Sequence, residues 1–533
     1  MNTEFIKPAS SHPATALRYN RRDLDARWGH ASSDGLTGAV LVYLLAPGWL
    51  FAVTWMQSGP GLATAIAGLA ALLVSRTGRG WPERLPVTCL CLALGMAWAG
   101  MTGAHHLVYS TADWEIRDAV LRDLSLDPWP VGYAEAGHSR TWLLRAPLGF
   151  FLPAGLIGRA MGFGAAQVAL WAWAGLGFAL VLMLLRTLAR ALDQARPGRA
   201  FAVMAFTFFL FGGLDLLPNL WLDTAAGAGP FASWGRGGEW WDRLFQYTGH
   251  VTATLWVPNH ALPAWLVALL VVRHGATAGF RLWAAVPIAG SLFWSPIAAA
   301  GAAVLGLAAL ASRGWRSILG ACVAPANILA ALSAFPIALY IVAGAAGVPH
   351  GLLLTEHPAP EALSRWLLLL MVEVLCWAGL ASVLVRYSIA TTATVLLCLL
   401  PFYVFGPGNE MTSRGGLAPV AVLAVVVAAA LITRTATLPQ AAAKVGLLAC
   451  AAIAAGGSLM EGSLLVTGRP WPASRQCSLP EAASQSVFRD STDWSHYLVS
   501  WPFLGGRHLI REPSLRPVAP SGVSSACWPG GGP

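Results

Sequence analysis

Apolar residues gather in long runs along most of this chain. A run of about 20 residues with almost no charge is typical of a membrane-spanning helix, because a helix of that length crosses the hydrocarbon core of a bilayer. About 13 such runs follow one another along the chain. They lie at 37–56, 61–75, 86–106, 164–187, 200–220, 258–273, 281–296, 297–312, 321–345, 363–385, 387–405, 416–433 and 444–464. The pattern predicts an all-α fold, a polytopic transmembrane helical bundle with a layer of loops on its outer face.

A further run, residues 143–161, is apolar but contains two prolines and two arginines. Charges and helix-breaking prolines at that density do not suit a span that faces lipid. We interpret this run as an interfacial or re-entrant helix.

Composition agrees with a membrane protein. The chain has 533 residues, of which 56% are hydrophobic and 11% charged, and its mean hydropathy is +0.59. A soluble globular protein carries about 25% charged residues. A soluble enzyme, a disordered chain and a fibrous chain are therefore excluded.

The few charges indicate an orientation, and we expect no nucleic-acid binding despite the net charge of +9. The positive-inside rule places the loops rich in arginine in the cytoplasm. These loops are 76–85, 186–199, 273–281, 313–316, 386 and 434–444. The more acidic outer loops are 107–163, 221–257, 346–362 and 406–415. We predict a cytoplasmic tail over 1–35, a transmembrane domain over 36–464 and an outer tail over 465–533 that lies on the outer loops.

The first outer loop is predicted to contain a short amphipathic helix over residues 113–126, with an apolar stripe and a polar face. Asp113 with Arg117, and Asp118 with Arg122, have the i, i+4 spacing of helical ion pairs.

Asp113 and Glu115 stand at the start of this helix, just beyond the third span. Acids at the mouth of a membrane cavity can act as a general base that activates an acceptor hydroxyl. The alternative is structural, because Ser110 and Asp113 fit a capping box and acids favour a helix N-terminus. Both interpretations stay open at this point.

Asn259 and His260 open the span 258–273 at its outer end. They could bind sugar hydroxyls or a phosphate at the positive end of a helix. The alternative is a capping Asn beside an interfacial Trp256.

Asn409, Glu410 and Arg414 lie in the short outer loop before the span 416–433. Arginine suits bidentate recognition of a phosphate, and the alternative is a set of solvated turn charges. The other outer arginines that could bind a phosphate are Arg140, Arg236 and Arg243.

Glu373 lies near the middle of the span 363–385. An ionisable residue there is costly and suggests function by default. It could be protonated, or paired with a polar residue on another helix, and a structural role is the alternative.

A divalent metal ion is a further possible cofactor, because carboxylates and imidazoles suit several such ions. No spacing is diagnostic of a metal site. The outer candidates are His105, His106, His350, Glu356 and His357, together with Asp113 and Glu115.

Two of the eight cysteines, Cys477 and Cys527, lie in the polar outer tail. A disulfide between them suits the oxidising side of the membrane, and two unpaired thiols are the alternative. The other six fall in apolar spans, where they are expected to pack as small residues.

Several segments resemble the GT-C superfamily of polytopic membrane glycosyltransferases, and more narrowly an uncharacterised bacterial group of GT-C-like proteins. The resemblance is carried by DWEIRDAVLRDLSLDPWPV (113–131), GFFLPAGLIGRAMG (149–162), LWVPNHALPAWL (255–266) and GNEMTSRGGLAPVAVL (408–423). The last segment departs from the group's pattern, since Glu410 stands where an Asp is expected and Arg414 is displaced. The segments cover a small part of the chain, but their order spans most of it.

The resemblance implies an enzyme of the bacterial cytoplasmic membrane that transfers a sugar from a polyprenyl-phosphate donor to a glycan, lipid or protein acceptor outside. It implies that Asp113, or else Glu115, is the catalytic base. Asn259, His260, Asn409, Glu410 and Arg414 would bind substrate. The alternatives are a transporter or flippase of a lipid-linked envelope precursor, and a non-catalytic membrane component of envelope assembly. The sequence contains no P-loop motif and no dinucleotide-binding motif after a strand, so a nucleotide-driven enzyme or pump is disfavoured.

Overall fold

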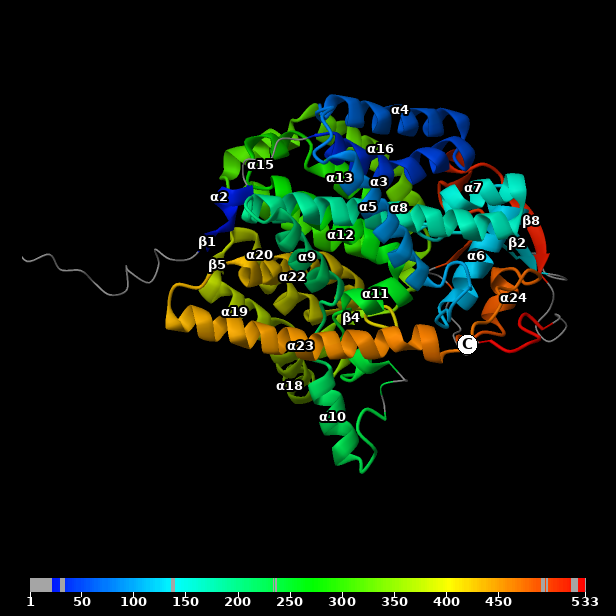
Figure 1. Cartoon of the computed structure of the whole chain (residues 1–533). Helices are drawn as coiled ribbons and strands as arrows, with labels where there is room; N and C mark the ends of the chain where they lie inside the picture. The colour runs from blue at the N-terminus through cyan, green and yellow to red at the C-terminus, as the bar shows by residue number, and fades with distance from the viewer. Residues whose placement is uncertain are drawn as a thin grey trace, which may run out of the picture.

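A computed structural model describes residues 22–28, 34–135, 140–232, 234, 237–489, 494, 497–518 and 526–532. The fold is mostly helical, with 68% helix. Long helices run side by side through the body, and a smaller mixed layer covers one end (Figure 1).

The α-helices have the following bounds: α2 (Leu24–Trp28), α3 (Gly35–Thr54), α4 (Ser58–Val74), α5 (Leu85–Ala99), α6 (Trp114–Leu126), α7 (Leu152–Met161), α8 (Phe163–Leu192), α9 (Pro197–Phe209), α10 (Leu216–Ala225), α11 (His250–Trp256), α12 (Pro258–His274), α13 (Ala285–Leu292), α14 (Pro296–Ala311), α15 (Trp315–Cys322), α16 (Pro325–Val342), α17 (Leu353–Glu356), α18 (Ala359–Leu370), α19 (Cys376–Leu384), α20 (Ser388–Leu399), α21 (Glu410–Gly415), α22 (Leu417–Ile432), α23 (Leu438–Thr467), α24 (Leu479–Ala483) and α25 (Gly506–Leu509). Short 3₁₀ segments are η1 (Gly100–Thr102), η3 (Gly238–Trp240), η4 (Ala278–Leu282), η5 (Ala345–Gly347) and η7 (Leu400–Phe402), and η6 (Met371–Leu375) is a π-helical turn.

Among the described residues, six helical stretches are long and apolar enough to cross a membrane. They are Gly35–Thr54, Leu85–Thr102, Phe163–Leu192, Pro325–Val342, Ala359–Leu384 and Leu438–Thr467. Four shorter apolar helices, Ser58–Val74, Pro296–Ala311, Ser388–Phe402 and Leu417–Ile432, coincide with further predicted spans. These ten stretches match the hydrophobic pattern of a membrane protein.

Two predicted spans are not continuous helices. The run 200–220 divides into α9 and α10, which are separated at residues 210–215, and α10 projects from the body (Figure 1). The run 281–296 contains only the end of η4 and the short α13, which ends at Leu292. Ser295 then caps the start of the next helix, α14, through its side chain. Hydropathy averages over such breaks, so the pattern overestimated both helices.

Helices α12 and α22 form the buried centre of the bundle. Every residue of α12 is buried, as is most of α22. Gly95 of α5 lies directly against α8, where a Cβ atom on Gly95 would come within 2.6 Å of the backbone of Gly175 and Ala179. Small residues allow this approach between helices.

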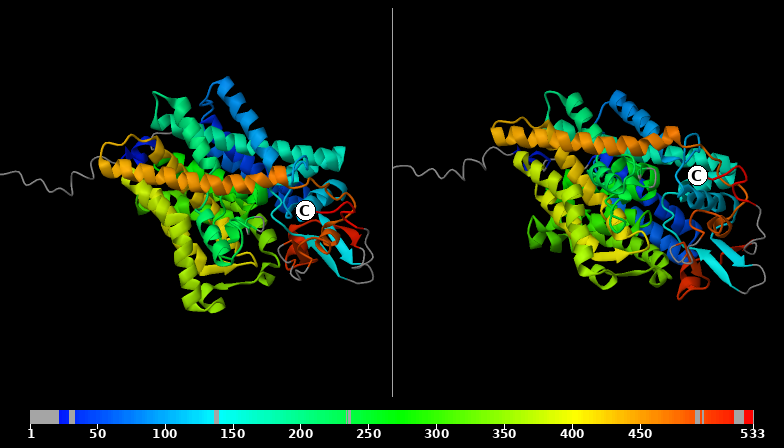
Figure 2. Two further views of the ribbon diagram at one scale, coloured as in Figure 1. Left: turned by 60° about the horizontal axis from the view of Figure 1, so that its bottom comes forward. Right: turned by 90° about the horizontal axis from the view of Figure 1, so that it is seen from below.

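A four-stranded sheet, which the hydrophobic pattern did not predict, forms part of the layer at one end of the body (Figure 2). Its order is β7-β3-β2-β8. The first outer loop supplies β2 (Val131–Glu135) and β3 (Thr141–Leu144), and the C-terminal tail supplies β7 (Leu498–Ser500) and β8 (Ser514–Val518). The tail therefore lies on the first loop, as expected.

Two further two-stranded sheets are small. They pair β1 (Arg22–Asp23) with β5 (Val385–Arg386), and β4 (His350–Leu352) with β6 (Tyr403–Phe405).

The predicted interfacial helix over 143–161 is wrong in its first half, because residues 141–144 form β3 and the helix α7 begins only at Leu152.

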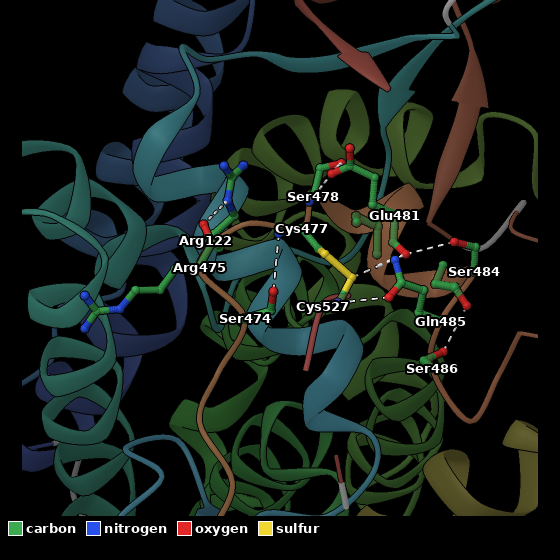
Figure 3. Close-up of a disulfide and its surroundings, with 12 residues drawn as sticks. Arg122, Ser474, Arg475, Cys477, Ser478, Glu481, Ser484, Gln485, Ser486 and Cys527 are labelled. Carbon is green, nitrogen blue, oxygen red and sulfur yellow. Dashed lines mark hydrogen bonds between the residues drawn. A yellow bond between two sulfur atoms is a disulfide. The ribbon is translucent and has the colours of Figure 1, made fainter. Parts of the chain in front are cut away.

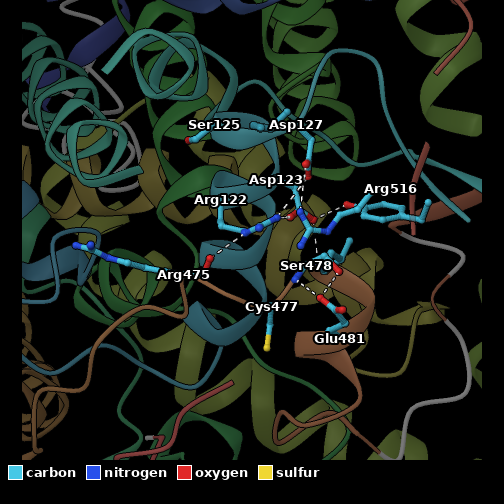
Figure 4. A network of polar contacts seen from close by, with 12 residues as sticks. Arg122, Asp123, Ser125, Asp127, Arg475, Cys477, Ser478, Glu481 and Arg516 are labelled. Carbon is cyan, nitrogen blue, oxygen red and sulfur yellow. Dashed lines mark hydrogen bonds and ion pairs between the residues drawn. The ribbon is translucent and has the colours of Figure 1, made fainter. Parts of the chain in front are cut away.

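Helix α6 confirms the helix predicted over 113–126, but its polar face is buried as well as its apolar stripe. The predicted pair of Asp118 with Arg122 is wrong. Arg122 instead contacts Asp123 at 2.8 Å and Asp127 at 3.4 Å, and its Nε donates to the carbonyl oxygen of Arg475 in the tail (Figure 4).

Asp123 is the centre of this network. Its carboxylate accepts hydrogen bonds from the Tyr133 hydroxyl at 2.7 Å and from the Leu479 N–H at 2.8 Å. Burial raises the pKa of Asp123 to about 6, although these bonds and Arg122 oppose the shift. The tail thus supplies hydrogen-bond partners that a buried carboxylate requires.

Cys477 and Cys527 form a disulfide, which confirms the disulfide predicted from the sequence (Figure 3). It joins the start of α24 to the last described segment, residues 526–532, across a sequence separation of 50. The Cys527 N–H also donates to the side-chain oxygen of Gln485.

We predict that replacing both cysteines, in Cys477→Ser/Cys527→Ser, loosens the tail. Loop closure of this length implies a loss of about 2–4 kcal/mol in the stability of the outer layer. Hydrogen exchange in residues 471–489 should rise several-fold, while exchange in α12 and α22 stays unchanged. The matched control is Cys89→Ser/Cys322→Ser, which removes two exposed free thiols. Equal exchange in both double variants would contradict the prediction.

Candidate functional site

Asp113 lies directly before α6, at the end of the body that carries the mixed layer. Its Oδ2 accepts a hydrogen bond from Arg117 Nη2 at 2.7 Å, which confirms the predicted ion pair. The capping box is wrong, because the Asp113 side chain makes no cap bond and the Ser110 hydroxyl donates to the Gly103 carbonyl oxygen. The Asp113 side chain is 27% exposed, and no residue in the described part of the chain bonds its Oδ1.

Arg117 holds Asp113 from a buried position. Its guanidinium lies over the Trp114 ring at 5.6 Å, and the residue is 6% exposed. Nη1 is buried and has no hydrogen-bond partner among the described residues. An unpaired buried donor is costly, so this nitrogen is available to an anionic or polar ligand.

His260 lies in the first turn of α12 and is held on both ring nitrogens. The Asn259 amide nitrogen is 3.1 Å from Nε2, and Ser295 Oγ is 2.7 Å from Nδ1. If the Asn259 NH₂ donates to Nε2, Nδ1 carries the proton and donates to Ser295. Asn259 Oδ1 is buried without a partner in the described part of the structure.

Arg414 lies in the short helix α21 and pairs with Glu410, one turn earlier, at 3.7 Å. Glu410 Oε2 is buried, with no partner found in the described ranges. The Asn409 side chain has a different partner, because its amide donates to the Leu244 carbonyl oxygen at 3.1 Å. The backbone of Gly301 in α14 touches that of Gly415, which fixes α21 against the helix that Ser295 caps.

These side chains share one electrostatic neighbourhood. The charges of Arg117 and Arg414 both act on the His260 imidazole. Burial raises the pKa of Tyr497, the charges of Asp113 and Glu410 add to that rise, and Arg117 and Arg414 oppose it. We call this set the outer cluster. Its members are Asp113, Arg117, Asn259, His260, Glu410, Arg414 and Tyr497.

Glu115 is separated from the outer cluster, because residues two apart on a helix do not face each other. It is 4% exposed, and its Oε2 accepts a hydrogen bond from the Val487 N–H at 2.9 Å. Gly532, near the end of the chain, also lies against Glu115. Burial raises the pKa of Glu115, and the Val487 bond opposes the rise. The tail thus covers the second carboxylate that the sequence suggested as a base.

The histidines and acids considered for a metal site do not gather. In the described part of the chain, no group of three or more His, Cys, Asp or Glu residues is placed to hold a metal ion. His106 contacts Asp118, His105 contacts the Gly100 carbonyl oxygen, and His350 stacks on Phe405. Glu356 ends α17 and His357 follows it, shortly after the strand β4 that begins at His350.

Glu373 is buried in the π-helical turn η6, and its carboxyl group lies beside that of the buried Asp215. The side chain of Glu373 occupies the space that a Cβ atom would take at Gly213. Of the possibilities raised for Glu373, a polar neighbour on another element is met by Asp215.

Two members of the outer cluster were not expected to bind substrate. Arg117 was visible in the sequence only as the ion-pair partner of Asp113. Tyr497 comes from the tail, nearly 400 residues later in the chain, and nothing in the local pattern distinguishes it. Arg140 and Arg243, the alternative phosphate ligands, are exposed, and Arg236 lies outside the described residues.

His106 links the first outer loop to the tail. Its Nε2 lies 2.6 Å from Asp118 Oδ2, and its Nδ1 lies 2.6 Å from the Trp471 carbonyl oxygen. When Asp118 is ionised both partners are acceptors, so both ring nitrogens donate and the ring is an imidazolium. Burial alone would lower the pKa of His106, but Asp118 and the Trp471 carbonyl outweigh burial and hold the pKa above its ordinary value.

Comparisons with protein-family models, curated proteins and solved structures find no match for this chain. The geometry of the outer cluster must therefore support the functional argument by itself.

We predict that the contact between the first loop and the tail weakens as pH rises. The folded-state pKa of His106 is raised, so its stabilising effect is complete below the ordinary pKa of about 6.5. The effect is lost as pH rises through the folded pKa, where deprotonation leaves Asp118 buried beside a neutral ring. Protease cleavage within residues 471–489 should be faster at pH 9 than at pH 6.

His106→Gln is the control, because glutamine cannot carry the charge. Its tail should be cleaved at a similar rate at both pH values, after correction for the protease's own pH dependence on an unfolded substrate. A wild-type protein with the same flat profile would refute the imidazolium assignment.

Proposed function

We propose that this chain is an integral membrane glycosyltransferase, which transfers a sugar from a polyprenyl-phosphate donor to an envelope acceptor on the outer face of the bacterial cytoplasmic membrane. The observation that carries the proposal is the partly exposed carboxylate of Asp113, which Arg117 Nη2 holds at 2.7 Å while Arg117 Nη1 has no hydrogen-bond partner among the described residues. A carboxylate beside a guanidinium group with an unpaired nitrogen suits a reaction between a hydroxyl and a phosphate-linked sugar.

In this proposal Asp113 is the general base. Its Oδ1 accepts the proton of the acceptor hydroxyl, and the acceptor oxygen then forms a bond to the anomeric carbon as the bond from that carbon to the phosphate oxygen breaks. The proton ends on Asp113, and the electron pair of the broken bond stays on the lipid phosphate. Arg117 Nη2 orients the carboxylate by its 2.7 Å contact with Oδ2.

The leaving phosphate gains negative charge, and two groups are available to stabilise it. Arg117 Nη1 is buried without a partner in the described structure, and Arg414 makes only a long contact with Glu410. Asn259, His260 and Tyr497 would provide hydrogen bonds to the sugar. No divalent metal ion is needed to balance these steps, and a metal-assisted route remains an alternative for the same acids.

We predict that Asp113→Asn lowers sugar transfer by roughly 10²–10⁴-fold, because the amide keeps the shape of the side chain but accepts no proton at neutral pH. Transfer would be measured with purified protein in lipid and a polyprenyl-phosphate sugar. The matched control is Glu361→Gln, which removes a carboxylate held in the same i, i+4 arrangement, at 2.8 Å from Arg365. Retained activity in Asp113→Asn would remove Asp113 from the mechanism.

We also predict that Arg117→Gln weakens binding of a polyprenyl phosphate by roughly 10–100-fold, because a charge-assisted hydrogen bond is lost. Native mass spectrometry would measure the lipid that stays bound. Arg365→Gln is the control, since it removes the arginine of the matched pair. Equal lipid retention in both variants would contradict a phosphate role for Arg117.

Two other functions keep some support. The neighbouring carboxyl groups of Asp215 and Glu373 lie buried among the helices, and buried carboxylates in membrane proteins often belong to transport pathways. This favours a transporter or flippase of a lipid-linked precursor, which would move the lipid without transferring the sugar.

The ion pair of Asp113 also suits a non-catalytic component of envelope assembly. A cavity of about 220 Å³ beside Trp494 and a larger one at the opposite end of the body both lack Asp113 among their lining residues. A folded wild-type protein that neither transfers nor moves the lipid would favour this function.

A further inference from the structure

A cavity of about 1140 Å³ opens at the end of the body opposite the outer cluster. Its walls come from segments far apart in the sequence, namely α2, the residue before α3, the loop 78–82, and the ends of α8 and α12. In Figure 1, α2 lies at the far end of the molecule from α6 and α24. The volume exceeds that of a typical small-molecule site, about 300–1,000 Å³.

Three arginines from three different helices line this cavity. Arg273 is buried and forms a two-point ion pair with Asp34, at 3.1 and 2.5 Å. Arg190 uses Nη1 to contact Glu83 at 3.1 Å and the Pro82 carbonyl oxygen. Arg27 is exposed, with no ion-pair or hydrogen-bond partner among the described residues.

The two loops that contribute residues to the cavity wall are strongly basic, although Arg190 is the one arginine of these loops in the lining. The loops 76–85 and 186–199 together contain seven arginines against only two acids, Glu83 and Asp193. This excess is more than the internal ion pairs neutralise, so the cavity has a net positive surrounding. An anionic ligand is therefore favoured over a cation or a neutral molecule.

Two tryptophan side chains indicate where the cavity would lie relative to the surface of a bilayer. Trp28 lines it from the buried side, and Trp81 is 43% exposed at its edge. Tryptophan is enriched at the level of lipid headgroups. The loops that form the rim also end the apolar helices α4, α5 and α8, which places the opening where a bilayer surface would meet the protein.

We propose that this cavity binds the phosphate-bearing headgroup of an anionic phospholipid from the cytoplasmic leaflet. The orientation comes from the positive-inside rule, and the proposal does not depend on glycosyltransferase activity. Arg27 and the free nitrogens of Arg190 contact the phosphate, Gln194 contacts the polar headgroup, and the acyl chains leave along the apolar helices. Basic pockets on the cytoplasmic side of a helix bundle are suited to such headgroups.

The test compares full-length protein with the variant Arg27→Gln/Arg190→Gln. Arg273 is left in place, so the buried pair with Asp34 stays intact. Native mass spectrometry from mixed micelles of phosphatidylglycerol and phosphatidylcholine would count retained lipids. Arg316→Gln is the matched control, because it removes an exposed arginine of the same face that does not line the cavity.

Wild-type protein and Arg316→Gln should retain phosphatidylglycerol in preference to phosphatidylcholine, and the double variant should bind it roughly 5–25-fold more weakly. Equal retention in the double variant would overturn the proposal. So would binding of soluble glycerol phosphate without binding of the lipid, which would identify a free phosphate site. Thermal unfolding in phosphatidylcholine alone checks folding, and there the double variant and the control should match.

Discussion

The outer layer depends on one constraint, that the polar face of α6 is buried and must find partners. A membrane protein with few charges concentrates several of them on this helix, and a buried charge without a partner is among the most costly features a fold can contain. The C-terminal tail meets this requirement. It brings backbone N–H groups to Asp123 and Glu115, and carbonyl oxygens to His106 and Arg122. The shape of the tail follows from these contacts.

The same constraint separates two neighbouring carboxylates into different roles. Glu115 is covered by the tail, while Asp113, two residues earlier, stays partly exposed beside Arg117. Helix geometry makes this division, since positions i and i+2 point to different sides. A feature that looked like an acidic pair in the sequence is therefore one structural acid and one candidate base.

The sequence predicted the helical class, most apolar helices and α6, because each depends on a local periodicity. It missed the four-stranded sheet, since β2 and β8 pair across almost 400 residues and neither strand shows a strong alternating pattern. It also predicted an ion pair between Arg122 and Asp118. In the structure Arg122 pairs with the neighbouring Asp123, and Asp118 contacts His106. Asp113, His260 and Arg414 were selected from the resemblance and from their places at the predicted outer ends of the helices, and the structure places them in one electrostatic neighbourhood. Tyr497 had no local signal, because its place is set by the pairing of β7 with β3.

The pairing of β2 with β8 has a consequence for how the protein is made. Val131 leaves the ribosome long before Ser514, its partner in the sheet. The polar groups of α6 therefore lack their partners from the tail while the residues between them are synthesised, and contacts this distant in sequence form slowly. The sheet that contains β2 can therefore be completed only after β8 has been synthesised. A chain that stops before its final strands would carry a complete set of apolar helices and an unfinished surface, which is a state that quality-control proteases can distinguish from the finished protein.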